Sequence, residues 1–374
     1  MRLNIQLLLL SFIISFATKA QDAPPPTVNL GDSAPPLRVN EWIKGKPIQT
    51  FEKGKVYVLE FWATWCKPCI AAMPHLSDLA REYNDKVKVL GIDVFEMKNT
   101  SPDKVKAFVK SMGNRMDFAV AAQDSNFMVN DWLEASGERP RYGIPRTFVV
   151  NAEGRLAWIG HPIDLDQVLP KIVNNTWNIK QALAKRNLDR YLATMDDSLN
   201  FELMRYRDIN NPEILGKPDS ALLAINEVIR QEPMLKYTPI IASYTFDALL
   251  QTNPHKAYEY GKEVLVTPTY DDPAYNRIIE VIEIYSDKLN LPSEIYQLGA
   301  EAYQVKIDQI PYPEIVDNIF KYYNKMAEWY WRGNDKSKAI KAEENAIESL
   351  KRKKDFSKTD MTAFESRLQQ YKTM

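Results

Sequence analysis

Two cysteines that lie three positions apart, between a strand-like segment and a helix-like segment, constrain the fold of this chain most. Residues 56–61 (VYVLEF) form a short apolar run that is typical of a buried β-strand. The chain then passes through Cys66 and Cys69 into residues 70–83, where apolar side chains recur at helical spacing. The sequence therefore predicts a buried strand that delivers a pair of thiols to the first turn of a helix.

The N-terminus is typical of an export signal, which bears on the redox state of the thiols. Arg2 supplies a positive charge, and the apolar residues 7–17 are too few to span a bilayer. Small residues at both ends of TKA (18–20) fit a cleavage site. We expect cleavage after Ala20 and a periplasmic protein, with an uncleaved N-terminal anchor as the alternative. No later run is apolar enough to cross a membrane, so we expect peripheral membrane contact or none.

The cysteine pair is better explained by redox chemistry than by structural cross-linking. The chain contains only these two cysteines. Oxidising compartments favour disulfides, but a bridge that closes so short a loop restrains the unfolded chain least. The start of a helix has unpaired N–H groups and a partial positive charge, and both stabilise the reactive thiolate.

The two thiols are expected to have different duties. Lys67 adds a positive charge beside them, and Pro68 fits a helix start, where its missing N–H is not needed. We expect Cys66 to be the more exposed thiol and the nucleophile. Cys69 lies one helical turn further on and is predicted to resolve the mixed disulfide.

The chain is long enough for more than one domain, and its character changes near residue 178. Strand-like runs occupy residues 56–61, 87–94, 118–121, 147–151 and 156–159, and helix-like runs occupy residues 70–83, 101–112, 125–135 and 165–173. This alternation predicts a mixed α/β sheet covered on both faces. We divide the chain into a signal peptide (1–20), a Pro-rich extended leader (21–36), an α/β domain (37–177) and an all-helical domain (178–374).

The helical half contains a weak repeat signal. In residues 323–347, the small residues Ala327, Ala339 and Ala346 fall at the spacing of a tetratricopeptide (TPR) helix pair, and residues 241–264 repeat the pattern more faintly. Small side chains at these positions allow two helices to approach closely. The pattern indicates TPR-like helical hairpins, and an ordinary helical bundle remains an equal alternative.

Three segments together resemble the thioredoxin superfamily, and especially its TlpA/ResA-like exported branch. They are FWATWCKPC at residues 61–69, MP at 73–74 and GIPRTF at 143–148, followed by a hairpin that contains Gly154. The resemblance covers roughly residues 30–177. It implies a thioredoxin-like fold for the first domain and a redox-active dithiol.

The resemblance also implies roles for residues outside the cysteine motif. Pro145 matches the cis-proline that lies against the cysteine pair, and it would turn the backbone of Ile144 toward an incoming peptide. Glu60 matches a buried acid that takes a proton from the resolving thiol. Burial would raise the pKa of this carboxyl group into a range suited to proton exchange. The alternative for Glu60 is a solvated residue at a strand edge.

The rim of the cysteine site is the expected docking surface for partners. Trp65 precedes the nucleophile and should line this surface together with Lys67, Pro68 and Ile144, whereas Trp62 is expected to lie in or near the core. Either tryptophan could instead serve packing alone.

Several other kinds of site and partner find no support in the sequence. A formal net charge of −1 gives no reason to expect nucleic acid or an anionic membrane as a partner. His75, His161 and His255 are scattered, and none pairs with the cysteines at metal-ligand spacing, so we expect no metal. We also expect no cofactor. The sequence contains no P-x-x-x-T-x-x-C segment, which a peroxiredoxin would carry.

Three functions remain open from the sequence. The leading prediction is an exported thiol–disulfide oxidoreductase that reduces disulfide-bearing partner proteins and is recharged by an upstream electron donor. The second is a disulfide isomerase, in which the helical half makes a homodimer around two dithiols. The third is a non-enzymatic, redox-switched protein whose helical domain binds a partner.

Overall fold

A computed structural model describes residues 25–122, 126–138, 143–267, 273–310, 318–352 and 358–373. The expected signal peptide and its cleavage site lie outside these residues. The chain divides into two compact units, and the boundary falls between Asn187 and Leu188, inside helix α5 (Ile179–Leu203). The sequence places this boundary near residue 178. The structure differs because Ile179, Ala182 and Leu183 of α5 pack onto the core of the first unit.

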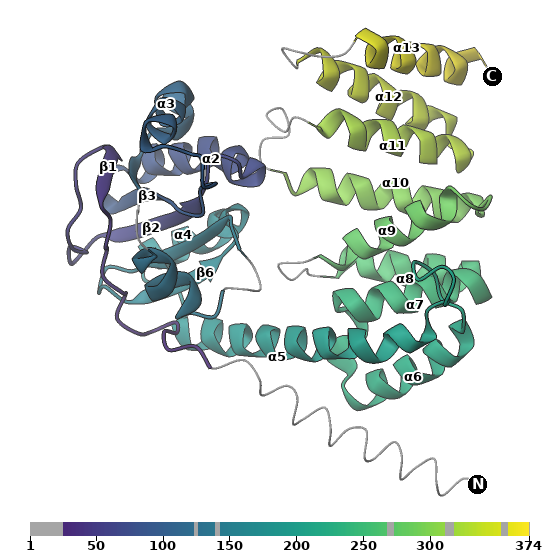
Figure 1. Ribbon diagram of the computed structural model, residues 1–374, viewed down its shortest axis with the longest axis horizontal. Coiled ribbons are helices and arrows are strands. Elements are labelled where there is room, and N and C mark those ends of the chain that lie inside the picture. The colour runs from purple at the N-terminus through teal and green to yellow at the C-terminus, as the bar shows by residue number, and fades with distance from the viewer. Residues whose placement is uncertain are drawn as a thin grey trace, which may run out of the picture. The chain divides into compact units, whose positions relative to one another are not determined.

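The first unit contains a six-stranded mixed sheet with the strand order β1-β4-β3-β2-β5-β6 (Figure 1). The strands are β1 (Glu41–Lys44), β2 (Val56–Trp62), β3 (Val87–Asp93), β4 (Ala119–Ala122), β5 (Arg146–Val150) and β6 (Leu156–Gly160). Strands β2, β3 and β4 are parallel, whereas β1, β5 and β6 are antiparallel to their neighbours. The predicted mixed α/β, thioredoxin-like fold is confirmed.

Each face of the sheet has its own hydrophobic core. The helices on one face are α2 (Lys67–Tyr83), α3 (Pro102–Met112) and α4 (Leu165–Val173). Val58 and Trp62 of β2 point to this face. Leu59 and Phe61 point to the other face, where Trp132 and the first turns of α5 cover them. Because both faces are covered, every residue of β2 is buried, which explains its nearly continuous apolar sequence.

Three local features differ from the sequence-based expectations. Strand β1 was not predicted, because its four residues are only half-buried and carry little apolar signal. The helix expected over residues 125–135 is π-helical at Val129–Glu134. Part of the expected leader belongs to the fold: Leu30 is buried, and the N–H of Leu156 in β6 donates to the carbonyl of Asp32 at 2.9 Å.

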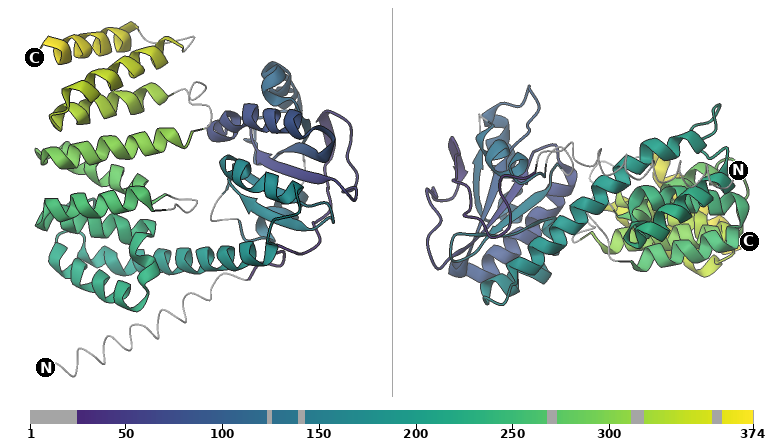
Figure 2. Two further views of the ribbon diagram at one scale, coloured as in Figure 1. Left: turned by 180° about the vertical axis from the view of Figure 1, so that it is seen from behind. Right: turned by 90° about the horizontal axis from the view of Figure 1, so that it is seen from below.

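The second unit is all-helical in its described residues. Beyond the C-terminal part of α5, its helices are α6 (Pro218–Gln231), α7 (Pro239–Thr252), α8 (Pro254–Val266), α9 (Ala274–Ser286), α10 (Ser293–Asp308), α11 (Ile319–Arg332), α12 (Lys336–Lys351) and α13 (Lys358–Thr373). They stack one on the next along the chain (Figure 2). Ala327 of α11 and Ala339 and Ala346 of α12 are completely buried, as close helix packing requires. Within the described segments, no helix has the length and apolar character to cross a membrane.

Candidate functional site

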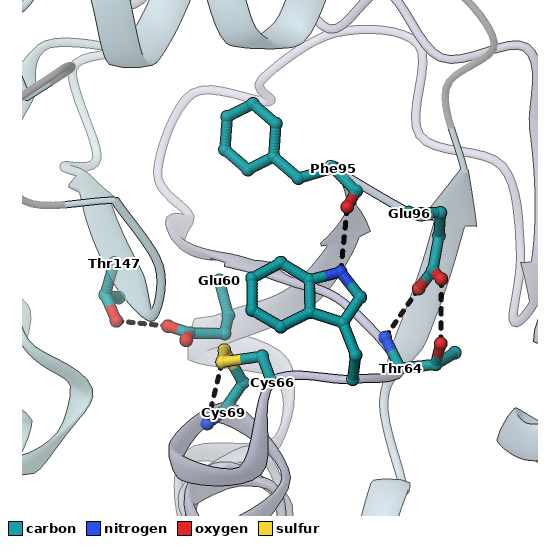
Figure 3. Close-up of a disulfide and its surroundings, with 8 residues drawn as sticks. Glu60, Thr64, Cys66, Cys69, Phe95, Glu96 and Thr147 are labelled. Atoms are coloured by element: carbon teal, nitrogen blue, oxygen red, sulfur yellow. Dashed lines mark hydrogen bonds between the residues drawn. A yellow bond between two sulfur atoms is a disulfide. The ribbon is translucent and has the colours of Figure 1, made fainter. Parts of the chain in front are cut away.

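The strand, the turn and the helix start place the two cysteines as the sequence predicted. Strand β2 ends at Trp62, and helix α2 begins at Lys67 with Cys66 as its N-cap residue. The backbone N–H of Cys69 donates to the Cys66 sulfur at 3.3 Å. Pro68 lies in the first turn, and the two cysteines form a disulfide (Figure 3). The disulfide therefore sits where the helix N-terminus favours a thiolate after reduction.

Both cysteines are buried in the disulfide, and Cys66 is the slightly more exposed of the two, as expected. Cys66 is 2% exposed and Cys69 is fully buried. The Cys66 sulfur has little exposure because it accepts the N-cap hydrogen bond of α2 and is bonded to Cys69. The exposed groups are the neighbouring side chains Trp65, Lys67 and Pro68, which form an accessible rim.

Glu60 lies in β2, and its carboxyl group lies beside the cysteine site (Figure 3). It is completely buried, and it pairs with Thr147 of β5, whose hydroxyl donates to Glu60 Oε2. Figure 3 shows its carboxyl group between Thr147 and the Cys66–Cys69 disulfide. Glu60 Oε1 is buried and has no hydrogen-bond partner among the described residues. This position excludes a solvated strand-edge residue.

The environment of Glu60 strongly favours its protonated form. Burial raises the pKa of the Glu60 carboxyl group to about 8, even though the Thr147 hydrogen bond and the positive charge of Arg146 act to lower it. Model thiols titrate at about 8.5. A carboxyl group with this proton affinity can therefore exchange a proton with a neighbouring thiol at little cost in free energy.

The loop before β5 carries the predicted cis peptide bond. The bond between Ile144 and Pro145 is cis. Pro145 is buried, whereas Ile144 is partly exposed and packs against the apolar cluster that contains Cys66 and Cys69. The predicted roles of Ile144 and Pro145 in binding a partner peptide stay predictions.

Sequence reasoning missed a pair of acids that holds the turn before Cys66. Glu96 accepts hydrogen bonds from the backbone N–H and from the hydroxyl of Thr64, the latter at 2.8 Å (Figure 3). Asp93, at the end of β3, is buried and hydrogen-bonded to Glu96. Burial and the charge of Glu96 raise the pKa of Asp93 to about 8. A sequence signal existed, because Asp93 ends a buried strand and Glu96 follows three residues later, and strand β3 is parallel to β2 and ends beside it.

The indole of Trp65 is fixed although it is 45% exposed. Its Nε1–H donates to the carbonyl of Phe95 at 2.8 Å. Phe95 adopts a φ of 58°, a left-handed backbone conformation that is uncommon for a bulky residue. The segment after β3 therefore holds both residues that precede Cys66, namely Thr64 and Trp65.

Comparisons with known proteins agree with this geometry. The AhpC/TSA family pattern matches residues 30–159. Protein FixW of Rhizobium leguminosarum is 34% identical over 167 residues, which are 43% of this chain and 74% of FixW. The chain belongs to the AhpC/TSA family. Its thioredoxin-like domain is related to thiol–disulfide oxidoreductases.

Two further relatives of this AhpC/TSA-family protein carry names that describe such chemistry. The thiol:disulfide interchange protein HelX of Rhodobacter capsulatus is 32% identical over 39% of this chain and 77% of HelX. The thiol-disulfide oxidoreductase ResA of Bacillus thuringiensis is 30% identical over 34% of this chain and 68% of ResA. Among solved structures, a thiol-disulfide isomerase from Corynebacterium glutamicum has a TM-score of 0.32 and 22% identity, over 42% of this chain and 97% of that one.

Proposed function

We propose that this protein is an exported, periplasmic thiol–disulfide oxidoreductase that reduces disulfides of partner proteins. The observation that carries the proposal is the buried carboxyl group of Glu60 beside the Cys66–Cys69 pair, with a pKa of about 8. A structural disulfide would not need a proton acceptor beside it. The relationship to HelX and ResA supports the same chemistry, and the N-terminal sequence supports export.

Reduction of a partner proceeds in two exchanges. The Cys66 thiolate attacks one sulfur of the partner disulfide, which forms a mixed disulfide and releases the other partner sulfur as a thiolate that takes up a proton. Cys69 gives its proton to ionised Glu60, and its thiolate then attacks the Cys66 sulfur. This step restores the Cys66–Cys69 disulfide, and the departing partner sulfur accepts a proton. Two electrons have passed from the enzyme to the partner.

The next cycle needs two electrons from outside the chain. A donor protein with a reduced dithiol supplies them through the same exchange in reverse. The donor disulfide is the other product, and the Cys69 thiolate recovers its proton from Glu60. Neither step uses a cofactor.

The rim of the site would bind the peptide that flanks the partner cysteine. Trp65 offers a fixed apolar surface, and Lys67 and Pro68 are exposed beside it. The backbone of Ile144, before Pro145, would pair with the partner chain. These four residues recognise shape and backbone, so they suit partners of varied sequence.

The helical unit would select partners or join two copies of the chain. The buried small residues Ala327, Ala339 and Ala346 support TPR-like packing of α11 on α12. Such helical hairpins present extended surfaces to other proteins.

Insulin reduction tests the proposal. The wild-type chain, supplied with dithiothreitol, should precipitate insulin chains faster than dithiothreitol alone, and Cys66→Ser should return the rate to that background. Glu153→Gln, at an exposed hairpin position, serves as a matched control and should behave as wild type. Equal background rates for wild type and Cys66→Ser would contradict the proposal.

A further inference from the structure

A cluster of three buried charges occupies the sheet face opposite the cysteine site. Arg146, the first residue of β5, forms an ion pair with Glu138, with Nε and Oε2 3.1 Å apart. Arg186 of α5 forms an ion pair with the other oxygen of Glu138 and donates to the carbonyl of Ser136 at 2.8 Å. The three side chains are at most 10% exposed. Glu138 therefore pairs with both Arg146 and Arg186.

The register of the sheet brings this cluster close to Glu60. Phe61 pairs with Arg146 across β2 and β5, and the preceding residue, Glu60, pairs with Thr147. Because side chains alternate along a strand, Glu60 and Thr147 point to the cysteine face and Arg146 points to the other. The charge of Arg146 acts on Glu60 through the sheet and lowers its pKa. Water does not screen this interaction, because both groups are buried.

Among the described residues, the other elements around Glu60 provide little competing charge. On β3, Gly91 lies opposite Glu60, and Asp93 is two residues further along. Asp93 has a pKa of about 8, so it is mostly uncharged near neutral pH. At the start of α2, Lys67 is exposed to solvent. Among the described residues, Arg146 is therefore the buried positive charge that acts on Glu60.

We propose that Glu138 and Arg186 are positioning residues that set the effective charge of Arg146 and thereby control proton transfer by Glu60. The proposal rests on the proposed role of Glu60 as the proton acceptor of Cys69. It makes α5, the helix that both units share, a contributor to the redox site. A displacement of α5 that withdrew Arg186 would change how readily Glu60 takes up a proton.

The charge balance predicts opposite effects for two neighbouring residues. Arg186→Met removes one of the two guanidinium groups that pair with Glu138, so the negative charge of Glu138 offsets more of the charge of Arg146 and the pKa of Glu60 rises. In Glu138→Gln, both guanidinium groups lose the negative charge of Glu138, so the pKa of Glu60 falls. Arg146→Met removes the positive charge that lowers the pKa of Glu60 and should give the largest rise. Loosened packing alone would not produce shifts of opposite sign.

A carboxyl titration measures the effect directly. The full-length oxidised chain, labelled with carbon-13 at the glutamate side-chain carboxyl, is titrated by NMR, and the Glu60 signal is assigned by its loss in Glu60→Gln. We expect midpoint shifts of about 0.5 to 1 pH unit, upward for Arg186→Met and downward for Glu138→Gln. Arg81→Met, which removes an exposed arginine, should leave the midpoint unchanged.

A conservative substitution keeps the test decisive even if one of the other variants does not fold. Arg186→Lys keeps the charge and should hold the Glu60 midpoint close to the wild-type value, even if Glu138→Gln does not fold. The proposal fails if Arg186→Met leaves the midpoint unchanged, or if Arg186→Met and Glu138→Gln shift it in the same direction. The titration needs no turnover. A failure here with Cys66-dependent insulin reduction intact therefore overturns this inference and not the proposed function.

Discussion

Replacing Glu60 with glutamine should stabilise the oxidised protein, and the gain should grow with pH. The folded pKa of Glu60, about 8, lies above the value of 4.5 expected in the unfolded chain. Between these two values the folded state holds a proton that the unfolded state has lost, so the free energy of unfolding falls as pH rises. At about 1.4 kcal/mol for each pH unit, the loss reaches about 5 kcal/mol above pH 8. The amide introduced by Glu60→Gln does not titrate, so its free energy of unfolding does not fall with pH for this reason.

Urea denaturation of the full oxidised chain between pH 4.5 and 9 measures this difference. The buried residues Trp62 and Trp132 report unfolding of the first unit by their fluorescence. The free energy of unfolding of Glu60→Gln minus that of wild type should be small at pH 4.5, rise through pH 6 and 7, and level off above pH 8. Groups common to both proteins, including Asp93, cancel in the difference.

A control variant and one clear outcome decide the test. Glu153→Gln removes an exposed carboxyl group in the β5–β6 turn, and its difference from wild type should be nearly independent of pH. If Glu60→Gln also shows a difference that is flat from pH 5 to 8, then Glu60 is not held protonated by burial. In that case the proton-transfer role assigned to it loses its physical basis.

Two further predictions concern the acid pair and the helical unit. Glu96→Gln should lower the pKa of Asp93, because the charge of Glu96 is one cause of its rise, and a carbon-13 titration of the Asp93 carboxyl group would show this. An unchanged midpoint would mean that burial alone sets the value. Gly299→Ala should destabilise the helical unit by about 1–3 kcal/mol in urea denaturation, because the new Cβ would lie 2.4 Å from the buried ring of Trp329. A stabilised variant would show that α10 and α11 repack easily.

The sequence predicted the parts of the fold that depend on local pattern. Strand β2 was recognised because it is buried on both faces and therefore almost continuously apolar. The cysteine pair was placed correctly because a strand, two cysteines and a helix follow one another without a gap. Strand β1 was missed because its four half-buried residues find their partner, β4, only through the tertiary fold.

The sequence pattern could not predict the hydrogen bonds and ion pairs that surround the site, because their partners lie far apart in the chain. Thr64 and Glu96 are 32 residues apart, and Glu138 and Arg186 are 48 residues apart. Each pair meets only because the sheet and α5 bring distant segments together. The same packing of the first turns of α5 moved the unit boundary from residue 178 to Asn187. The burial of Glu60 was anticipated because the resemblance to thioredoxins suggested an acid at that position.

The most direct test of the account is a trapping experiment with single-cysteine variants of the full chain. The reduced Cys69→Ser variant is mixed with insulin, and the products are separated without reductant and mapped by mass spectrometry of their peptides. The account predicts an accumulating mixed disulfide through Cys66, and little or none through Cys69 in Cys66→Ser. Equal trapping through Cys69, or no mixed disulfide in either variant, would contradict the assignment of Cys66 as the attacking thiol.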